Sequence, residues 1–248
     1  ELTRLFLQGC YTGQKTQAVI EKFRPLLKKA LNDYISETMN DKIKKTIEYY
    51  NNNAADFYLS TVNADMSYCR DKFVALLPKG AKILDAGCGS GRDSKAFMEK
   101  GFCITAFDAS GELCALASNY IGKPVACMRF EEMEWQEEFD GGWACASLLH
   151  IPKKDMNKVF NLIYTALKAG GIFYTSFKFG DAEEVRRERF YSDYTPTQIK
   201  ELFERNNRFE ILECFITGDV RENHRDERWV NVIAVKHDTT MEQSPCRI

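Results

Sequence analysis

The sequence lacks the segments that direct a protein into or across a membrane. No apolar run in its 248 residues approaches the ~20 residues that a membrane-spanning helix needs. No basic segment followed by an apolar one opens the chain, as it would in a secretory signal peptide. The first residue is Glu1 rather than Met, so we expect a processed or truncated form of a longer protein. These absences predict a cytoplasmic protein with no membrane partner.

The cysteines lack the spacing of a disulfide framework or a zinc site. There are nine of them, an odd number, and no C-x-x-C pair occurs. Several lie in apolar runs, such as Cys103 in "GFCITAF" and Cys145 in "GWACASLL". We therefore expect reduced thiols in the core and no metal site, with a redox-active cysteine as the less favoured alternative.

A strong excess of one charge is also missing. The 34 basic and 36 acidic residues give a formal net charge of −2. That balance provides no electrostatic basis for bulk binding to nucleic acid or to an anionic membrane, although it permits a local basic patch. The hydrophobic fraction of 44% is enough for the core of one large domain, with or without an extension.

The N-terminal part of the chain has helical periodicity. Within residues 14–48, apolar residues recur at the spacing of one broad helix face, and lysines dominate the other face. Pro25 interrupts this pattern and is expected to begin a second helix. Residues 48–80 are predicted to be helical, with a polar break at Asn51–Asn53. We predict an N-terminal helical extension over 1–47, the main domain over 48–238 and a flexible tail over 239–248.

From residue 81 onwards, predicted strands and helices alternate, which indicates βαβ units and a mainly parallel sheet. No helix separates the last two strands, so they are expected to pair as an antiparallel hairpin. A charged loop is predicted over 180–194. The fold class is therefore α/β: a Rossmann-like open sheet of seven strands with a C-terminal antiparallel hairpin and helices on both faces. The predicted strands are 81–87, 102–108, 124–130, 141–149, 171–179, 209–219 and 228–237, and the helices between them are 92–101, 111–122, 153–170 and 195–207.

A glycine-rich turn, "ILDAGCGSGRDSKAF" over residues 83–97, joins the first strand to the next helix. Ligands of open α/β sheets bind beyond the carboxyl ends of the strands, where this turn lies. Its spacing is G-x-G-x-G, and Arg92 stands where the dinucleotide pattern needs a third glycine, which disfavours a nicotinamide-dependent dehydrogenase. The alternative, a tight turn that serves packing alone, is less favoured.

Two carboxylates accompany the turn. Asp85 precedes Gly87 by two residues and suits a ligand ammonium better than a pyrophosphate, which it would repel. Asp108 ends the second predicted strand, where a carboxylate can hold both hydroxyls of a ribose. The alternative role for Asp108 is that of a helix N-cap.

The segments "LDAGCGSG", "AFDAS" and "FDGGWACASLLH" resemble the class I S-adenosylmethionine-dependent methyltransferases, and the terminal hairpin matches that fold. Within the class, the sequence is most similar to the tellurite-resistance-like (TehB-like) and other small-molecule methyltransferases. The resemblance implies S-adenosylmethionine as cofactor and a set of residues that bind it. These are Asp85, Ala86, Gly87, Cys88, Gly89 and Gly91 for the methionine part, Asp108, Ala109 and Ser110 for the ribose, Arg129 and Phe130 for adenine, Ala146 for the methyl region, and Tyr50 and Tyr58 as a cover.

One expected residue of the adenine site is missing. The family's usual acidic residue does not stand at Arg129, so Glu131 or Glu132 would have to substitute for it, or the backbone alone would be used.

His150 is the best candidate for a catalytic base, because it follows the fourth predicted strand at the edge where ligands bind. A structural hydrogen-bonding role in a loop is equally compatible with the sequence. Arg92, Lys178, Tyr191 and Arg225 are candidate ligands for an anionic acceptor. A soft sulfur, selenium or tellurium nucleophile would need no base at all.

The [DN]-P-P-[YF] tetrad of DNA amino-methyltransferases is absent, since "ASLLHIP" stands in its place. The sequence therefore predicts a methyltransferase that acts on a small-molecule acceptor and not on DNA. A soft nucleophile or an anionic metabolite is the favoured acceptor. The alternatives are a non-catalytic module that binds the cofactor for regulation, and a methyltransferase of RNA or protein. The oligomeric state is not predicted.

Overall fold

A computed structural model describes residues 13–221, 224 and 226–237, and the side chains of 13–22, 27 and 31–38 lie outside that description. The predicted tail over 239–248 lies outside it as well. The chain divides into two compact units, Glu1–Lys42 and Ile43–Ile248. The division falls inside a helix, five residues before the predicted start of the main domain.

That helix, α2, is continuous from Gly13 to Asn52 and contains Pro25, so the prediction of a second helix starting at Pro25 is wrong. Proline removes one backbone hydrogen bond, but the alanine, leucine, lysine and glutamate residues on both sides are strong helix formers. The polar break is present, because α2 ends at Asn52 and α3 begins at Ala54. The second unit contains the last turns of α2 and everything that follows.

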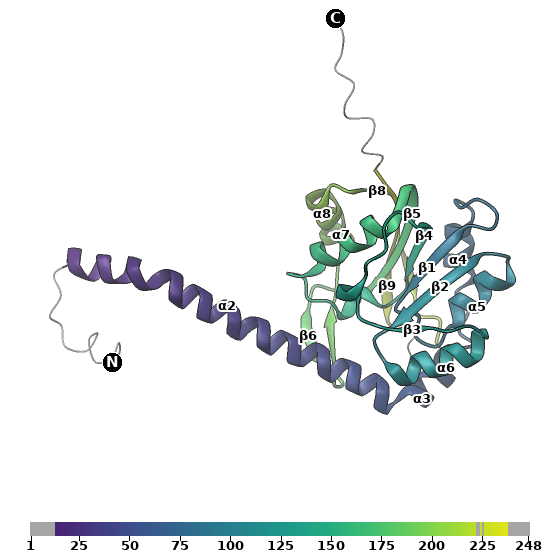
Figure 1. Cartoon of the computed structure of the whole chain (residues 1–248), viewed down its shortest axis with the longest axis horizontal. Helices are drawn as coiled ribbons and strands as arrows, with labels where there is room; N and C mark the ends of the chain where they lie inside the picture. Colours follow the sequence, from purple (N-terminus) through teal and green to yellow (C-terminus); the bar gives the residue numbers. More distant parts are fainter. Residues whose placement is uncertain (1–12, 222–223, 225, 238–248) are drawn as a thin grey trace, which may run out of the picture. The chain divides into compact units, whose positions relative to one another are not determined.

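The second unit is built on one seven-stranded sheet with the order β3-β2-β1-β4-β5-β9-β8 (Figure 1). The first five strands are parallel, and β9 is antiparallel to both β5 and β8. The predicted fold class is confirmed. The strands are β1 Lys82–Ala86, β2 Cys103–Asp108, β3 Ala126–Cys127, β4 Phe139–Ala144, β5 Leu167–Lys178, β8 Phe209–Gly218 and β9 Arg228–Lys236.

Helices cover both faces of this sheet (Figure 1). The helices are α3 Ala54–Thr61, α4 Ser67–Val74, α5 Arg92–Glu99, α6 Gly111–Ile121, α7 Met156–Ala166 and α8 Pro196–Asn206, with the 3₁₀ turns η1 Phe130–Glu132 and η2 Leu148–His150. Neighbouring residues of β1 face opposite ways: Ile83 packs with Phe73 of α4 and Phe97 of α5, whereas Leu84 faces the α7 and α8 layer. Strand alternation therefore gives the sheet two apolar faces, as a doubly covered sheet requires.

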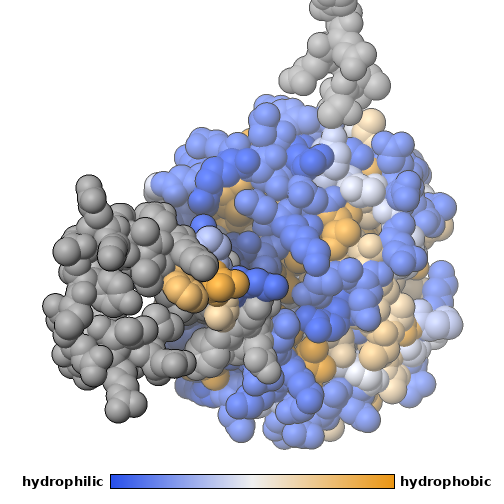
Figure 2. Space-filling view, turned by 60° about the vertical axis from the view of Figure 1, so that its left-hand side comes forward, coloured by the Kyte–Doolittle hydropathy of each residue, from blue (hydrophilic) through white to orange (hydrophobic). Residues whose placement is uncertain are grey.

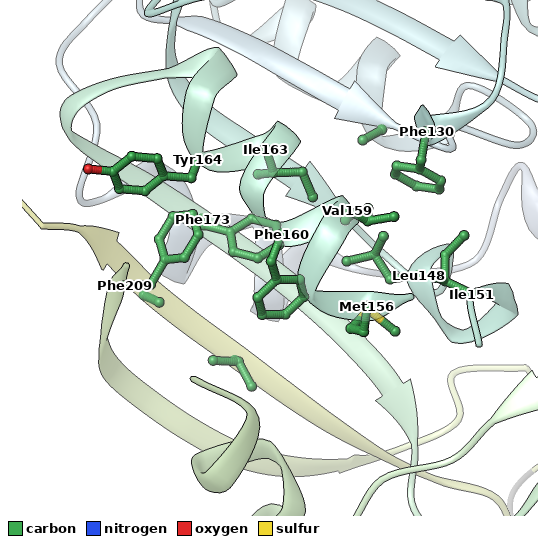
Figure 3. Packing of buried hydrophobic residues seen from close by; sticks show 14 of the residues in the cluster. Phe130, Leu148, Ile151, Met156, Val159, Phe160, Ile163, Tyr164, Phe173 and Phe209 are labelled. Atoms are coloured by element: carbon green, nitrogen blue, oxygen red, sulfur yellow. The ribbon is translucent and has the colours of Figure 1, made fainter. Parts of the chain in front are cut away.

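The core beneath α7 and α8 is aromatic (Figure 3). The ring centroids of Phe160 and Phe173 lie 5.6 Å apart at 89°, and those of Phe160 and Phe203 lie 5.1 Å apart at 72°. Edge-to-face pairs of this kind add about 0.5–1.5 kcal/mol each beyond the area they bury. Phe173 of β5 belongs to this core, and Lys178 at the carboxyl end of β5 reaches the functional site.

Several predicted boundaries need correction. The third strand consists of Ala126–Cys127 alone, and the fourth ends at Ala144 because Ala146 takes a positive φ of 53° and leads into η2. The helix predicted over 153–170 ends at Ala166, and the residues after it already belong to β5. Cys103, predicted to be buried, is exposed because it opens β2 at the edge of the core.

The loop predicted over 180–194 is largely a β-hairpin. Strands β6 Glu183–Arg186 and β7 Arg189–Ser192 pair antiparallel, and Arg187 and Glu188 form the two-residue turn with φ of 48° and 64°. Turns with two positive φ values normally contain asparagine or glycine. The missing turn signal is the reason that the sequence pattern indicates a loop.

Among the residues that the structure describes, no helix combines the length and the apolar character needed to cross a bilayer. The face of the molecule in Figure 2 is mainly hydrophilic, and its apolar residues form small separate patches. Small separate patches are ordinary on a protein surface and do not indicate an interface.

Candidate functional site

The glycine turn places backbone, rather than side chains, at the carboxyl end of β1. Gly87, Gly89 and Gly91 have φ values of 79°, 54° and 76°. A side chain on Gly87 would bring its Cβ within 2.5 Å of the Ser147 Cβ atom, so this position needs glycine for space as well as for φ. The backbone N–H groups of Gly87 and Cys88 both donate to the carbonyl of Phe107, at 2.9 and 3.0 Å. The turn is thereby tied to β2.

Asp85 lies buried at the end of β1 and lines the cavity beyond the turn. One carboxylate oxygen accepts a hydrogen bond from the Ser94 hydroxyl at 2.6 Å. Burial, together with the nearby carboxylates of Asp93 and Asp108, raises the pKa of Asp85 to about 7. A carboxyl group poised in this way gains most from a cationic ligand, which would stabilise its ionised form.

Asp108 at the end of β2 is oriented by two backbone donors. The N–H of Gly89 donates to its Oδ2 and the N–H of Ser110 donates to its Oδ1, each at 2.9 Å. Burial raises the pKa of Asp108, and these backbone donors oppose the shift. The N-cap of α6 is Ser110, whose hydroxyl accepts from the Leu113 N–H at 3.2 Å, so the capping role considered for Asp108 belongs to Ser110.

Glu131 is the acidic residue at the end of the cavity where β3 finishes. It lines the cavity, and its Oε2 atom is buried with no hydrogen-bond partner among the described residues. Glu132 does not line the cavity, because its Oε2 accepts the backbone N–H of Arg129 at 2.7 Å and caps η1. Of the two glutamates, Glu131 is the one that can reach a ligand. We call Asp85, Gly87, Gly89, Asp108 and Glu131 the glycine-turn end of the cavity.

Arg92 lines the cavity but is already neutralised. Its guanidinium binds Asp93 through two hydrogen bonds, of 2.9 and 2.7 Å, and Asp93 also accepts from Arg70 at 2.7 Å and from the Trp143 indole at 3.0 Å. Burial alone would raise the pKa of Asp93, but the two guanidinium groups lower it to about 2. Arg92 therefore holds the start of α5 in place and has little charge left for an anionic ligand.

His150 and Tyr50 form a hydrogen-bonded pair that lines the cavity. The His150 Nδ1 lies 2.5 Å from the carbonyl oxygen of Phe190, which can only accept, so Nδ1 carries the proton. The Nε2 therefore accepts, and the Tyr50 hydroxyl donates to it at 2.9 Å. Burial lowers the pKa of His150 to about 4. His150 is thus neutral at pH 7, and its lone pair is occupied.

Cationic and aromatic side chains gather at the same end of the cavity as His150. The ring of Tyr191 has Arg186 at 4.6 Å from its centroid and Lys178 and Arg189 each at 5.4 Å. We call Tyr50, His150, Lys178, Arg189 and Tyr191 the cationic end of the cavity. This cluster joins the end of α2 to β5 and to the β6–β7 hairpin.

Both ends open into one cavity of about 630 Å³, within the ~300–1,000 Å³ range of small-molecule sites. The predicted site residues that line it are Tyr50, Asp85, Gly87, Cys88, Gly89, Arg92, Asp108, Ala109, Ser110, Arg129, Phe130, Ala146, His150, Lys178 and Tyr191. Within the part of the chain that is described, no group of three His, Cys, Asp or Glu residues could hold a metal ion.

Three of the predicted residues that the structure describes do not line the cavity. Ala86 is buried within β1, and Gly91 faces Ala117 and Ile121 of α6. Tyr58, expected to cover the cofactor, packs edge-on against Tyr120 at 5.9 Å because α3 turns that face toward α6. Arg225 lies outside the described residues.

Sequence patterns missed several lining residues. Phe57 of α3 lies beside the turn, where a Cβ on Gly89 would be 3.1 Å from its ring. Arg189 lines the cationic end from a hairpin that was predicted as a loop. Ser147 binds the carbonyl of Ala86 at 2.7 Å. Arg189 had a signal, because it stands among basic and aromatic residues in the charged segment over 180–194. Phe57 follows Tyr50 at a helical spacing of seven residues, but the helix break at Asn53 separates the two.

Comparison with known proteins agrees with this geometry. Residues 83–171 match the family model described as "Methyltransferase domain". The Bacillus subtilis (strain 168) protein named "Putative methyltransferase YqeM" is 31% identical over 119 residues, which cover 43% of this chain and 48% of that protein. The aligned part thus spans about half the length of this curated relative.

Solved structures show the same fold. The Burkholderia thailandensis 1,6-didemethyltoxoflavin-N1-methyltransferase, with bound 1,6-didemethyltoxoflavin and S-adenosylhomocysteine, aligns with a TM-score of 0.64 and 21% identity over 84% of this chain and 90% of its own. The magnesium protoporphyrin IX methyltransferase of Synechocystis PCC 6803, with bound S-adenosylmethionine, aligns with a TM-score of 0.59 and 17% identity over 79% of this chain and 97% of its own. The [4+2]-cyclase SpnF aligns with a TM-score of 0.61 and 17% identity over 77% of this chain and 94% of its own.

Residues 83–171 therefore match a methyltransferase domain, and the chain shares its fold with solved methyltransferases that hold S-adenosylmethionine or S-adenosylhomocysteine. The cyclase shows that the fold by itself also carries other chemistry, so the reaction has to be argued from the site.

Proposed function

We propose that the protein transfers a methyl group from S-adenosylmethionine to a small-molecule acceptor. This acceptor is an anion, or a nucleophile whose lone pair is available without removal of a proton. The observation that carries the proposal is the single cavity that joins the glycine-turn end to the cationic end. The methyltransferase-domain match supports the cofactor half of the proposal. The acceptor half rests on the charges and hydrogen bonds of the cationic end.

The glycine-turn end fits the cofactor group by group. Asp85 is a buried carboxylate with lone pairs left for an ammonium. Asp108 is oriented by two backbone donors and can accept from two ribose hydroxyls. The unpartnered Oε2 of Glu131 can accept from the amino group of adenine, and Phe130 offers an apolar ring beside it. When bound, the cofactor supplies an electrophilic methyl group on a sulfonium.

The hydrogen bonds of His150 limit which kind of nucleophile the acceptor can use. A histidine whose Nε2 is occupied by Tyr50 and whose pKa is about 4 is a weak proton acceptor at neutral pH. A hydroxyl acceptor needs a base, whereas a carboxylate, a thiolate, a selenide or a ring nitrogen does not. His150 therefore supports an acceptor whose lone pair is already available, and its role is to hold Tyr50 and the hairpin in position.

The charges of the cationic end favour an acceptor of negative charge. Lys178, Arg186, Arg189 and Arg221 line this part of the cavity, and of these four only Arg189 has no carboxylate partner among the described residues. The last turns of α2 and the β6–β7 hairpin supply its walls, which suits a small molecule better than a polymer. The closer likeness to tellurite-resistance-like methyltransferases stays a prediction, and soft oxyanions such as selenite and tellurite belong among the acceptors tested.

Titration calorimetry tests the cofactor. We expect S-adenosylmethionine and S-adenosylhomocysteine to bind and NAD not to bind. Binding of NAD without binding of the sulfonium would overturn the proposal.

A methyl-transfer screen with labelled cofactor tests the acceptor. The pools are carboxylates, phosphates, thiols, amines, selenite and tellurite, RNA, and protein. Methylation confined to RNA or protein would overturn the small-molecule assignment. Cofactor binding without transfer to any pool would instead support a regulatory, non-catalytic module.

A further inference from the structure

We infer that Arg189 selects the acceptor by binding an oxyanion on it, either a carboxylate or a phosphate. The inference rests on the proposed function, because it assigns a substrate class to the same cavity. It starts from a difference among the cationic side chains there: Lys178, Arg186 and Arg221 have a carboxylate partner, and Arg189 has none among the residues that the structure describes.

Three of these cations are already paired. Lys178 forms an ion pair with Glu227, Arg186 binds Asp193 at 2.6 Å through two hydrogen bonds, and Arg221 binds Asp219 at 2.6 Å. Each carboxylate neutralises most of the field that its cation would exert on a ligand. These three residues shape the wall of the cavity more than they attract an anion.

Arg189 has aromatic neighbours instead. Its guanidinium carbon lies 4.6 Å from the ring centroid of Tyr49, 5.7 Å from that of Tyr50 and 5.4 Å from that of Tyr191. No carboxylate oxygen of the described residues lies within 4.0 Å of it. The guanidinium shares a side-chain hydrogen bond with Tyr50, and its Nε atom is buried without a hydrogen-bond partner. Arg187 and Arg228 also line this part of the cavity without a carboxylate partner in the described part of the chain, but both are exposed to water.

A partly buried guanidinium with an unused N–H is costly until a ligand satisfies it. A carboxylate or phosphate can accept two parallel hydrogen bonds from the guanidinium fork, and a neutral amide cannot do so with comparable strength. The chemistry of the unpaired group therefore points to an oxyanion.

The surrounding contacts hold the guanidinium in one orientation. Tyr50 is fixed by its hydrogen bond to His150, and β7 is fixed by the Phe190 N–H, which donates to the Thr46 hydroxyl at 2.9 Å. His150 also donates to the carbonyl of Phe190, the residue next to Arg189. Tyr50 and His150 thus act as positioning residues, and a prearranged receptor loses less entropy on binding.

The experiment uses the full chain saturated with S-adenosylhomocysteine, and three aromatic probes of similar shape: benzoate, phenyl phosphate and neutral benzamide. Calorimetry gives the affinity of each probe for the wild type, Arg189→Gln, Arg189→Lys and the control Arg208→Gln. Arg208 is a matched control, because its guanidinium also stacks on a tyrosine, 4.8 Å from the ring centroid of Tyr164, and it does not line the cavity.

We expect at least one of the two anionic probes to bind the wild type, with its affinity reduced tenfold or more in Arg189→Gln and severalfold in Arg189→Lys. Arg208→Gln should match the wild type, and benzamide should bind equally weakly to every variant. Which anionic probe responds tells a carboxylate site from a phosphate site.

The inference would be overturned if the anionic probes bound Arg189→Gln as tightly as they bind the wild type. It would also be overturned if the affinity of the wild type for benzamide equalled its affinity for benzoate and for phenyl phosphate. If Arg189→Gln does not fold, the same comparison is made with Arg189→Lys, where unchanged affinity for the anions overturns the bidentate assignment. Failure of the proposed function would appear elsewhere, as absent S-adenosylhomocysteine binding or as methylation of a polymer alone.

Discussion

The glycine-turn end of the cavity is made mostly of backbone and two strand-end carboxylates, whereas the cationic end is made of side chains from segments far apart in the sequence. Asp85 and Asp108 follow directly from where β1 and β2 stop, and neighbouring parallel strands bring them to one edge. Tyr50, Lys178 and Arg189 meet only because α2, β5 and the hairpin pack together. The first end depends on local chain geometry, and the second depends on tertiary packing.

The sharpest way to break the glycine-turn end is to add one methyl group at Gly87. In Gly87→Ala, the positive φ costs about 1–2 kcal/mol, and the clash with Ser147, at 2.5 Å between the two Cβ positions, costs about 1–3 kcal/mol more. We expect the free energy of unfolding to fall by their sum and cofactor binding to be lost. Chemical denaturation and calorimetry measure the two effects.

Gly80→Ala is the matched control for that substitution. Gly80 has a similar φ of 71°, but nothing lies within 4 Å of its Cβ position. The control should lose only the cost of the positive φ and keep the cofactor affinity. Equal losses in the two variants would mean that the approach of Ser147 is unimportant.

The next largest effect tests the ribose ligand. Asp108→Asn keeps the shape of the side chain, but it removes the charge and replaces one acceptor oxygen by an NH₂ donor. We therefore expect the binding free energy of the cofactor to weaken by about 2–3 kcal/mol, or its affinity to fall roughly 30- to 150-fold. The control is Asp140→Asn, because Asp140 also accepts a backbone N–H, that of Lys82 at 2.8 Å, and lies away from the cavity. Equal affinities in wild type and Asp108→Asn would remove Asp108 from the site.

The contrast explains what the sequence could predict. The order of strands and helices, the terminal hairpin and the strand-end carboxylates all follow from short-range patterns: hydrophobic runs, glycine spacing and the residue at which each strand stops. Asp85 and Asp108 are cases in which one local segment determines the environment of the side chain. The cavity contains both residues, together with most of the turn.

The cationic end could not be predicted in the same way. The hairpin that contains Arg189 turns at Arg187 and Glu188, which have none of the usual turn chemistry. Whether an arginine is free or paired depends on contacts such as Arg186 with Asp193, which tertiary packing creates. The low pKa of His150 likewise comes from burial that no local pattern indicates. The sequence left two roles open for His150, a catalytic base and a structural hydrogen-bonding residue, and its hydrogen bonds support the proposal of the second role.

A smaller effect should appear on acidification at the glycine-turn end. The pKa of Asp85 is raised to about 7, so the carboxyl is ionised at pH 8 and mostly protonated at pH 6 in the unliganded protein. Only the ionised form attracts an ammonium, so affinity for S-adenosylhomocysteine should fall about tenfold between pH 8 and pH 6. Asp93, with a pKa of about 2, stays ionised throughout and contributes no slope.

The variant Asp85→Asn separates this titration from others. It should bind the ligand more weakly at pH 8 and show a nearly flat profile between pH 6 and pH 8. The wild-type slope persisting in Asp85→Asn would assign the titration to another group.

The smallest expected effect sharpens the view of the cationic end. Asn is a close mimic of the Nδ1–H of histidine, so His150→Asn keeps the donor to the Phe190 carbonyl and removes the Nε2 that accepts from Tyr50. If His150 only positions its neighbours, turnover should fall no more than about threefold, because no proton transfer is lost. A general base would contribute roughly 10²–10⁴-fold, which is far outside that range.

His150→Leu is the companion variant: it leaves the Phe190 carbonyl without a donor and should cost about 1–3 kcal/mol in the free energy of unfolding. A loss of turnover beyond a hundredfold in His150→Asn, with unfolding unchanged, would restore His150 as the base and with it a hydroxyl acceptor.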